Sequence, residues 1–221
     1  MSEESHVLVI FPHPDDETFS SAGTLAHYID EGVPVTYACL TLGQMARNLG
    51  NPPFATRESL PKIRERELED AAKAIGIKDL RKMGYRDKTV EFEPHEKMDG
   101  MVKSLIDELH PSVIISFYPG YAVHPDHEAT AEAVVRTVGR MPKAERPRLQ
   151  LVAFSNDAID ELGMPDIIND ITDYREVKLD AFKAHASQSG PFLHQLAEPQ
   201  VPDTAKSFLE QETYWTYNFE S

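Results

Sequence analysis

The chain has 221 residues, of which 41% are hydrophobic, so it is long enough for a buried core and too apolar for intrinsic disorder. Its 22 basic and 37 acidic residues give a net charge of −15. Contacts with nucleic acid or with an anionic membrane surface need an excess of Lys and Arg, so we expect neither partner. No stretch approaches the about 20 consecutive apolar residues that span a bilayer.

Cys39 is the only cysteine, which excludes an internal disulfide. The apolar run at 35–40 around it favours a buried, inert thiol over a nucleophile. The acidic N-terminal segment lacks the basic flank of a signal peptide, so we expect a cytoplasmic protein. The composition carries no information on subunit number and is compatible with a homo-oligomer.

Strands and helices are expected to alternate along most of the chain. An apolar run rich in β-branched residues predicts a buried strand at 6–11, a helical pattern follows at 16–32, and a second buried strand occupies 33–40. This order predicts a right-handed parallel crossover. The same alternation continues with helices expected at 61–76, 94–109, 125–138 and 174–188, and strands at 80–83, 113–118 and 149–154.

The last third of the chain is less regular, with a helix expected at 202–212 and an edge strand at 214–219. The alternation as a whole predicts a Rossmann-like three-layer α/β/α fold with a mostly parallel sheet, in one domain that spans residues 1–221. Neither G-x-G-x-x-G after the first strand nor G-x-x-x-x-G-K-[ST] is present. We therefore do not expect dinucleotide or ATP binding of the usual kind.

Four polar groups follow the first strand within five positions, namely His13, Asp15, Asp16 and Glu17. Ligands of an open α/β sheet bind at the carboxyl ends of its strands. One interpretation is that the acids cap a helix and favour its positive end. The other is that His13 and one Asp bind a divalent metal, because imidazole nitrogen and carboxylate oxygen suit zinc. Capping alone does not explain His13 or the prolines on either side of it.

A second turn repeats this layout after the strand at 113–118, where His124-Pro125-Asp126-His127 precedes a helix. The alternative is that Pro125 occupies the first helical turn and His124 merely precedes it. Both turns follow parallel strands, so they should open on the same edge of the sheet. His124 and His127 are three residues apart and can face one centre. This convergence favours one shared metal site.

The connection at 41–60 is long for a compact domain, so we expect a functional loop or a lid. It carries Gln44, Arg47, Asn48 and Arg57, whose polar side chains could face a ligand. None of them receives a role from the sequence alone.

The two His-Pro-Asp turns also give the chain a family resemblance. It resembles the LmbE/PIG-L family of zinc-dependent N-acetyl-sugar deacetylases through Pro12-His13-Pro14-Asp15-Asp16-Glu17, Arg64-x-x-Glu67, His124-Pro125-Asp126-His127 and His185-Ala-Ser-Gln188. Within the family it looks closest to the deacetylases of bacillithiol biosynthesis, which remove acetate from N-acetylglucosaminyl malate. Family members often carry an acid where this chain has Gln44.

The resemblance implies that His13, Asp16 and His127 hold the metal, either zinc or another divalent ion such as Fe²⁺. It implies that Asp15 is the general base of the hydrolysis. The chemistry agrees, because zinc lowers the pKa of bound water towards about 7, where a carboxylate can take the proton. The expected partner is a small N-acetylated amino-sugar substrate.

The same resemblance implies roles for three further residues. His124, as an imidazolium, would stabilise the oxyanion, and Asp126 would hold and charge its ring. Arg64 would bind a substrate anion, such as a malate carboxylate, through its bidentate fork. The alternative for Arg64 is an ion pair on the helix surface with Glu67 or Glu69.

Other classes of protein share parts of this pattern. A non-catalytic binding protein on the same fold would be favoured by a missing base or ligand, but Asp15 and His127 are both present. A two-metal phosphoesterase needs more carboxylate ligands than the two turns offer. Among deacetylases, another N-acetylglucosamine derivative is the alternative substrate. A single histidine on a helix is more often packed than functional, so His185 is left unassigned.

Overall fold

The fold is built on a sheet of seven strands in the computed structural model, which describes residues 4–197 and 206–219. The strand order is β3-β2-β1-β4-β5-β7-β6, and the strands are β1 (Val7–Phe11), β2 (Val35–Cys39), β3 (Asp79–Lys82), β4 (Val113–Phe117), β5 (Arg148–Val152), β6 (Ile167–Asp170) and β7 (Gln211–Thr216). Strands β1 to β5 are parallel to one another, whereas β7 is antiparallel to β5 and β6. The predicted mostly parallel α/β fold is confirmed.

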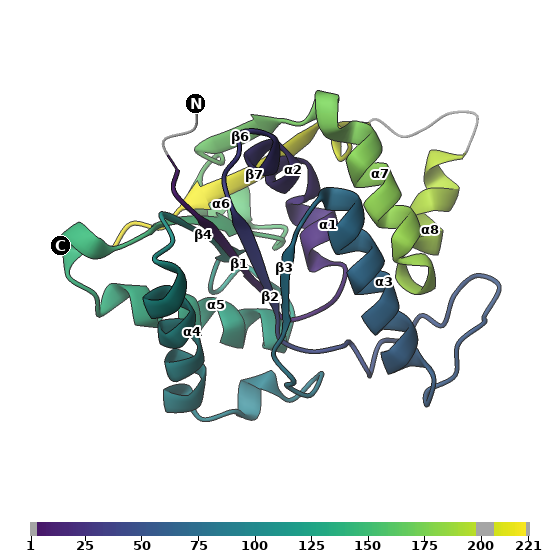
Figure 1. Ribbon diagram of the computed structural model, residues 1–221, viewed down its shortest axis with the longest axis horizontal. Coiled ribbons are helices and arrows are strands. Elements are labelled where there is room, and N and C mark those ends of the chain that lie inside the picture. Colours follow the sequence, from purple (N-terminus) through teal and green to yellow (C-terminus); the bar gives the residue numbers. More distant parts are fainter. Residues whose placement is uncertain (1–3, 198–205, 220–221) are drawn as a thin grey trace.

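Helices cover both faces of this sheet, with α1, α2, α3, α7 and α8 on one side and α4 and α5 on the other (Figure 1). The helices are α1 (Asp16–Ser20), α2 (Ala22–Asp30), α3 (Leu60–Ile75), α4 (His95–Leu109), α5 (Pro125–Gly139), α6 (Ala158–Leu162), α7 (Arg175–Ala184) and α8 (Ala186–Leu196). Short 3₁₀ turns occupy Val90–Phe92, Lys143–Glu145 and Thr172–Tyr174. Within the described ranges, no helix has both the length and the apolarity to cross a membrane.

Strand β1 lies at the centre of the sheet and is buried on both faces, as its unbroken apolar sequence predicts. Val7, Val9 and Phe11 pack into the core beneath α2, α3 and α7. Leu8 and Ile10 point the opposite way into the core beneath α4 and α5. Because successive side chains of a strand point to opposite faces, β1 packs against both layers of helices.

Two helices that the sequence predicts as continuous are interrupted. The segment predicted at 16–32 breaks at Ser21, where the backbone leaves the helical region with φ −147°. Helix α2 then begins again under the carboxylate of Glu212, which accepts the N–H groups of Gly23 and Thr24 at 3.1 and 2.7 Å. A buried carboxylate at a helix N-terminus satisfies backbone donors and favours the positive end of the helix. The segment predicted at 174–188 is also interrupted, at His185 between α7 and α8, where φ is −81° and ψ is 46°.

The C-terminal part differs most from the sequence expectations. Of the helix predicted at 202–212, residues 202–205 lie outside the described residues, and Gln211 and Glu212 belong to β7. The strand predicted at 214–219 is shifted to 211–216, and it is not at the edge, because β6 pairs beyond it. The sequence pattern predicts neither strand β6 nor helix α6. Burial on both sides of β7 by β5 and β6 stabilises this strand, and such pairing between distant segments leaves little local signal.

A buried ion pair joins the last strand to the helical layer. Lys178 on α7 donates from Nζ to Glu212 Oε1 on β7 at 2.8 Å, and both side chains are almost completely buried. The same Lys178 ammonium lies 4.6 Å from the centre of the Phe208 ring. Because Glu212 also holds the start of α2, this pair connects α2, α7 and β7.

Lys178→Met should lower the free energy of unfolding by about 3–5 kcal/mol, because Glu212 would keep a buried charge without its cation. Lys183→Met is the matched control, since Lys183 lies on the same helix and its ion pair with Asp180 is exposed. Urea titrations followed by circular dichroism measure both changes. The expectation fails if the two variants lose the same small amount of stability.

Candidate active site

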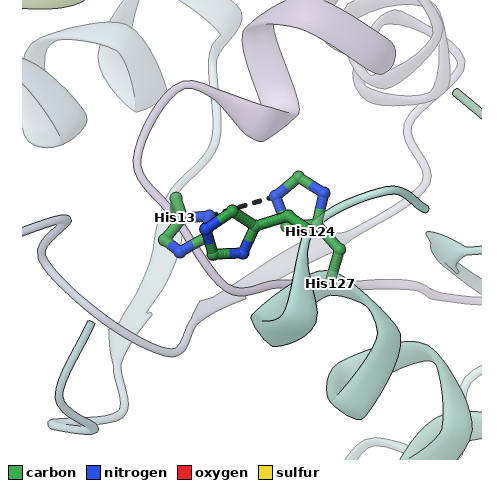
Figure 2. A group of neighbouring side chains, drawn as sticks. All are labelled: His13, His124 and His127. Carbon is green, nitrogen blue, oxygen red and sulfur yellow. Dashed lines mark hydrogen bonds between the residues drawn. The ribbon is translucent and has the colours of Figure 1, made fainter. Parts of the chain in front are cut away.

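The two His-Pro-Asp turns lie side by side because β1 and β4 are neighbouring parallel strands. The turn after β1 carries His13, and α5, which follows β4, carries His127 in its first turn. Figure 2 shows the rings of His13, His124 and His127 grouped together from these two segments. The sequence therefore correctly placed both turns at one edge of the sheet.

The three predicted metal ligands bring their donor atoms close together. His13 Nδ1 lies 3.0 Å from His127 Nε2, and Asp16 Oδ1 lies 3.4 Å from the same nitrogen. Asp16 Oδ2 lies 3.7 Å from His13 Nδ1. Atoms that bind one tetrahedral zinc at about 2.0–2.2 Å are about 3.4 Å apart, so this donor set fits a divalent metal. His124 offers a further nitrogen within 4.8 Å of those of the other two histidines.

His13 is held from behind by two buried carboxylates. Its Nε2 lies 3.2 Å from Asp126 Oδ2 and 3.2 Å from Asp87 Oδ1. Burial lowers the pKa of His13, but the hydrogen bonds to Asp126 and Asp87 outweigh burial and raise it to about 10. Nδ1 of His13 thus faces Nε2 of His127, whose own Nδ1 lies 3.2 Å from the carbonyl oxygen of Ala122. These outer contacts fix which ring nitrogens face each other.

Asp87 is a site residue that the sequence pattern does not reveal. It follows β3 and is buried at the same edge of the sheet as the two turns. Its Oδ2 accepts the N–H of Met45 at 2.6 Å, and its own N–H donates to Gln44 Oε1 at 3.1 Å. The sequence signal that could have identified Asp87 is its position as an acid just beyond a third parallel strand. These contacts give Gln44 a structural role, because it fastens the start of the long loop to the cleft.

The expected pairing of the Asp126 carboxylate with the His124 ring is wrong. The Asp126 carboxylate contacts His13 and accepts the N–H groups of Lys88 and Val90 at 2.7 and 3.1 Å. His124 Nδ1 instead accepts the backbone N–H of Asp126 at 3.1 Å, as the N-cap of α5. Burial and the neighbouring His13 and His127 lower the pKa of His124. This direction of the pKa favours the neutral ring of His124, whose expected role in the reaction stays a prediction.

Asp15 stands in a left-handed backbone conformation, with φ 98°, at the start of α1. Its Oδ2 pairs with Nη2 of Arg64 at 3.1 Å, and Arg64 also donates to the carbonyls of Gly43 at 3.0 Å and of Pro14. Burial raises the pKa of Asp15 to about 6, although Arg64 acts in the opposite direction. Arg64 is 3% exposed, so in this structure it binds Asp15 and the turn around it. The expected ion pair on the helix surface is therefore wrong, whereas substrate binding by Arg64, which lines the cleft, stays a prediction.

Glu17 supports this turn from below. Its carboxylate is fully buried and accepts hydrogen bonds from Thr18 Oγ1 at 2.8 Å, Tyr37 OH at 3.0 Å and the N–H of Asp15 at 3.1 Å. It also pairs with His185 Nε2 at 2.7 Å. Burial lowers the pKa of His185, but the charges of Glu17 and Asp15 outweigh it and raise the pKa. His185 is therefore packed beneath the cleft.

The long loop is fastened to its surroundings at several points. Asn48 Nδ2 donates to the Gln188 carbonyl at 3.1 Å, and Gln188 Nε2 donates to the Asn48 carbonyl at 3.2 Å. Arg57 donates from Nη1 to the carbonyl of Ala46 at 2.7 Å. Arg47 is exposed and does not line the cleft. These contacts place Ala46 and Gln188 at the edge of the cleft.

The cleft above these residues has a volume of about 330 Å³. It is lined by His13, Asp15, Asp16, Phe19, Ala46, Arg64, Asp87, Lys88, His124, His127, Phe154 and Gln188. Every predicted ligand, the predicted base and Arg64 contribute to this lining, whereas Asp126 lies behind it. Phe19, Lys88 and Phe154 are further lining residues that no sequence motif identifies.

A mostly parallel α/β sheet with a His-Asp-His donor set and a separate carboxylate at its carboxyl edge defines a class of proteins built for metal-assisted chemistry on a small ligand. The PIG-L family, described as GlcNAc-PI de-N-acetylase, matches residues 8–138, and the chain belongs to this family. The family predicted from the two His-Pro-Asp turns is therefore confirmed.

Individual relatives agree with this assignment. The chain is 50% identical to a probable N-acetyl-alpha-D-glucosaminyl L-malate deacetylase 2 of Bacillus anthracis, over 99% of this chain and 98% of the relative. The protein of the same name from Bacillus subtilis is 44% identical over 98% and 99% of the two chains. Among solved structures, N,N'-diacetylchitobiose deacetylase from Pyrococcus horikoshii superposes with a TM-score of 0.71 at 26% identity, covering 97% of this chain and 84% of that one.

Zinc binding to the metal-free protein at pH 7 should release a proton, because His13 has a pKa of about 10 and must lose its proton to become a ligand. Affinity should therefore rise with pH until about pH 10. Calorimetry in buffers of different ionisation enthalpy measures the release. His127→Ala should lose the metal, whereas His27→Ala, at an exposed histidine on α2, should keep it. Binding heats that are independent of the buffer would contradict the assignment of His13.

Gly43→Ala should reduce activity about a hundredfold, because the new Cβ would lie 1.6 Å from Nη1 of Arg64 and push the guanidinium off Asp15. Gly84→Ala is the matched control, since Gly84 also has a positive φ (76°) but nothing lies within 4 Å of the place that its new methyl group would take. It should cost only the backbone strain of about 1 kcal/mol. Acetate-release assays and thermal unfolding separate the two effects, and equal activities in the two variants would refute the role of Arg64.

Proposed function

We propose that this chain is a divalent-metal-dependent deacetylase that hydrolyses N-acetylglucosaminyl L-malate to glucosaminyl malate and acetate, as in bacillithiol biosynthesis. The names of relatives that are 44–50% identical over nearly the whole chain support this substrate. The observation that carries the proposal is a carboxylate, Asp15, beside the His13-Asp16-His127 donor set in one cleft. The excess of acidic residues disfavours a polyanionic partner.

His13, Asp16 and His127 would hold the metal, with zinc as the first choice and ferrous iron as the alternative. A divalent ion at this position supplies Lewis acidity, which polarises an acetamide carbonyl and acidifies water. Asp126 and Asp87 orient His13 from behind, so that Nδ1 faces the donor set. Ala122 does the same for His127 through its carbonyl.

Asp15 is the proposed general base. Its pKa of about 6 lies near physiological pH, where a carboxylate is mostly ionised yet basic enough to take a proton from the attacking water. The pairing of Oδ2 with Arg64 fixes the direction of the carboxylate. The proton accepted by Asp15 can then pass to the nitrogen of the leaving amine, which needs one proton when the amide bond breaks.

His124 is the proposed donor to the oxyanion, in its neutral form. Because Nδ1 accepts the N–H of Asp126, the ring proton of a neutral His124 resides on Nε2. An Nε2–H donor in a partly desolvated cleft stabilises the charge that develops on the carbonyl oxygen. This assignment replaces the imidazolium with a neutral donor that is held by the first turn of α5.

Asp15→Asn should lower acetate release by about 10²- to 10⁴-fold, because an amide cannot accept the proton, while metal content stays unchanged. Elemental analysis and an assay of free amine on N-acetylglucosaminyl malate measure the two quantities. Asp157→Asn, at an acid before α6 that does not line the cleft, is the control. Full turnover by Asp15→Asn would remove it as the base, and release of phosphate from phosphomonoesters by the wild type would favour a phosphoesterase.

A further inference from the structure

The charges that line the cleft are unevenly paired. Three carboxylates line it, those of Asp15, Asp16 and Asp87, and only two permanently cationic side chains, those of Arg64 and Lys88, lie among its described lining residues. Arg64 is buried and its guanidinium pairs with Asp15 at 3.1 Å. The guanidinium of Arg64 is therefore already paired when a substrate with a carboxylate aglycone enters the cleft.

Lys88 is the second permanently cationic side chain among the described lining residues. Its side chain is exposed, and within residues 4–197 and 206–219 no acidic group lies within ion-pair distance of its ammonium. Arg57, another cation of this region, donates to the carbonyl of Ala46, and Arg47 lies outside the lining. An unpaired ammonium at the cleft is therefore available to a ligand.

The backbone of Lys88 is fixed in an unusual conformation. Its φ is 61°, in the left-handed region that side-chain-bearing residues rarely adopt. The Asp126 carboxylate holds it there, by accepting the N–H of Lys88 at 2.7 Å while its Oδ2 contacts His13 Nε2 at 3.2 Å. Lys88 is thus tied to the same carboxylate that orients a proposed metal ligand. Backbone strain that is held in place beside a cleft points to a use for the side chain.

We infer that the Lys88 ammonium binds a carboxylate of the aglycone and so gives the enzyme its preference for an anionic glucosamine conjugate. This inference rests on the proposed deacetylation. The contact is a charge-assisted hydrogen bond from Nζ to a carboxylate oxygen of the aglycone. Arg64, for which the sequence predicted this role, already pairs with Asp15 in this structure.

The test compares the specificity ratio of kcat/KM for N-acetylglucosaminyl L-malate to kcat/KM for methyl N-acetyl-α-glucosaminide. Lys88→Gln should lower this ratio about tenfold to a hundredfold, mainly through KM, and Lys88→Arg should restore most of it. The wild-type ratio should also fall with added salt, whereas that of Lys88→Gln should change little. Lys62→Gln, which removes one exposed charge outside the cleft lining, should leave the ratio unchanged.

An unchanged ratio in Lys88→Gln, with both substrates still hydrolysed, would overturn the inference and leave the deacetylase proposal intact. Absence of acetate release from every glucosamine conjugate by the wild-type holoenzyme would overturn the deacetylase proposal and the inference with it. A parallel loss on both substrates would assign Lys88 a structural role only, and would also count against the inference. Inhibition by free L-malate of hydrolysis of the neutral conjugate gives a second readout, which Lys88→Gln should weaken about tenfold or more.

Discussion

The parallel pairing of β1 with β4 is the constraint on which the cleft depends. The register aligns Val7 with Val113 and Val9 with Ile115, and this brings the two following turns to the same edge. A slip of one residue would shift one turn by about 3.3 Å, and it would exchange the two faces of the strand. That shift is as large as the 3.0 Å between His13 Nδ1 and His127 Nε2. Tight packing of β1 on both faces therefore defines the donor set.

Behind the groups that face the cleft lies a second layer of buried polar partners. His13 contacts the carboxylates of Asp126 and Asp87, and Asp15 forms an ion pair with Arg64. Leaving any of these charges buried without a partner would be costly, so each outer group restricts the group in front of it. The left-handed turns at Asp15 and Lys88 are also held by hydrogen bonds to buried carboxylates. The geometry of the cleft is thus set by electrostatic pairing as well as by strand packing.

Local sequence patterns predicted most strands and helices and the position of both His-Pro-Asp turns, whereas features that depend on distant residues were not predicted. The β1 strand and the two His-Pro-Asp turns can be predicted from the sequence because each pattern lies within a few consecutive residues. The break at Ser21 depends on Glu212, which is distant in the sequence. Arg64 pairs with Asp15 because the turn after β1 brings the Asp15 carboxylate to it. Asp87 has no motif of its own and becomes visible only once β3 is placed in the sheet.

The order of strands at the C-terminal side of the sheet has a consequence for folding. Strand β6 precedes β7 in the chain, yet β7 is inserted between β5 and β6. During synthesis, β6 therefore has no neighbour in the sheet until the last strand has emerged from the ribosome. The first five strands can assemble as a parallel platform, whereas the final two must dock together. Docking of β7 thus completes this side of the sheet and also brings Glu212 to the start of α2.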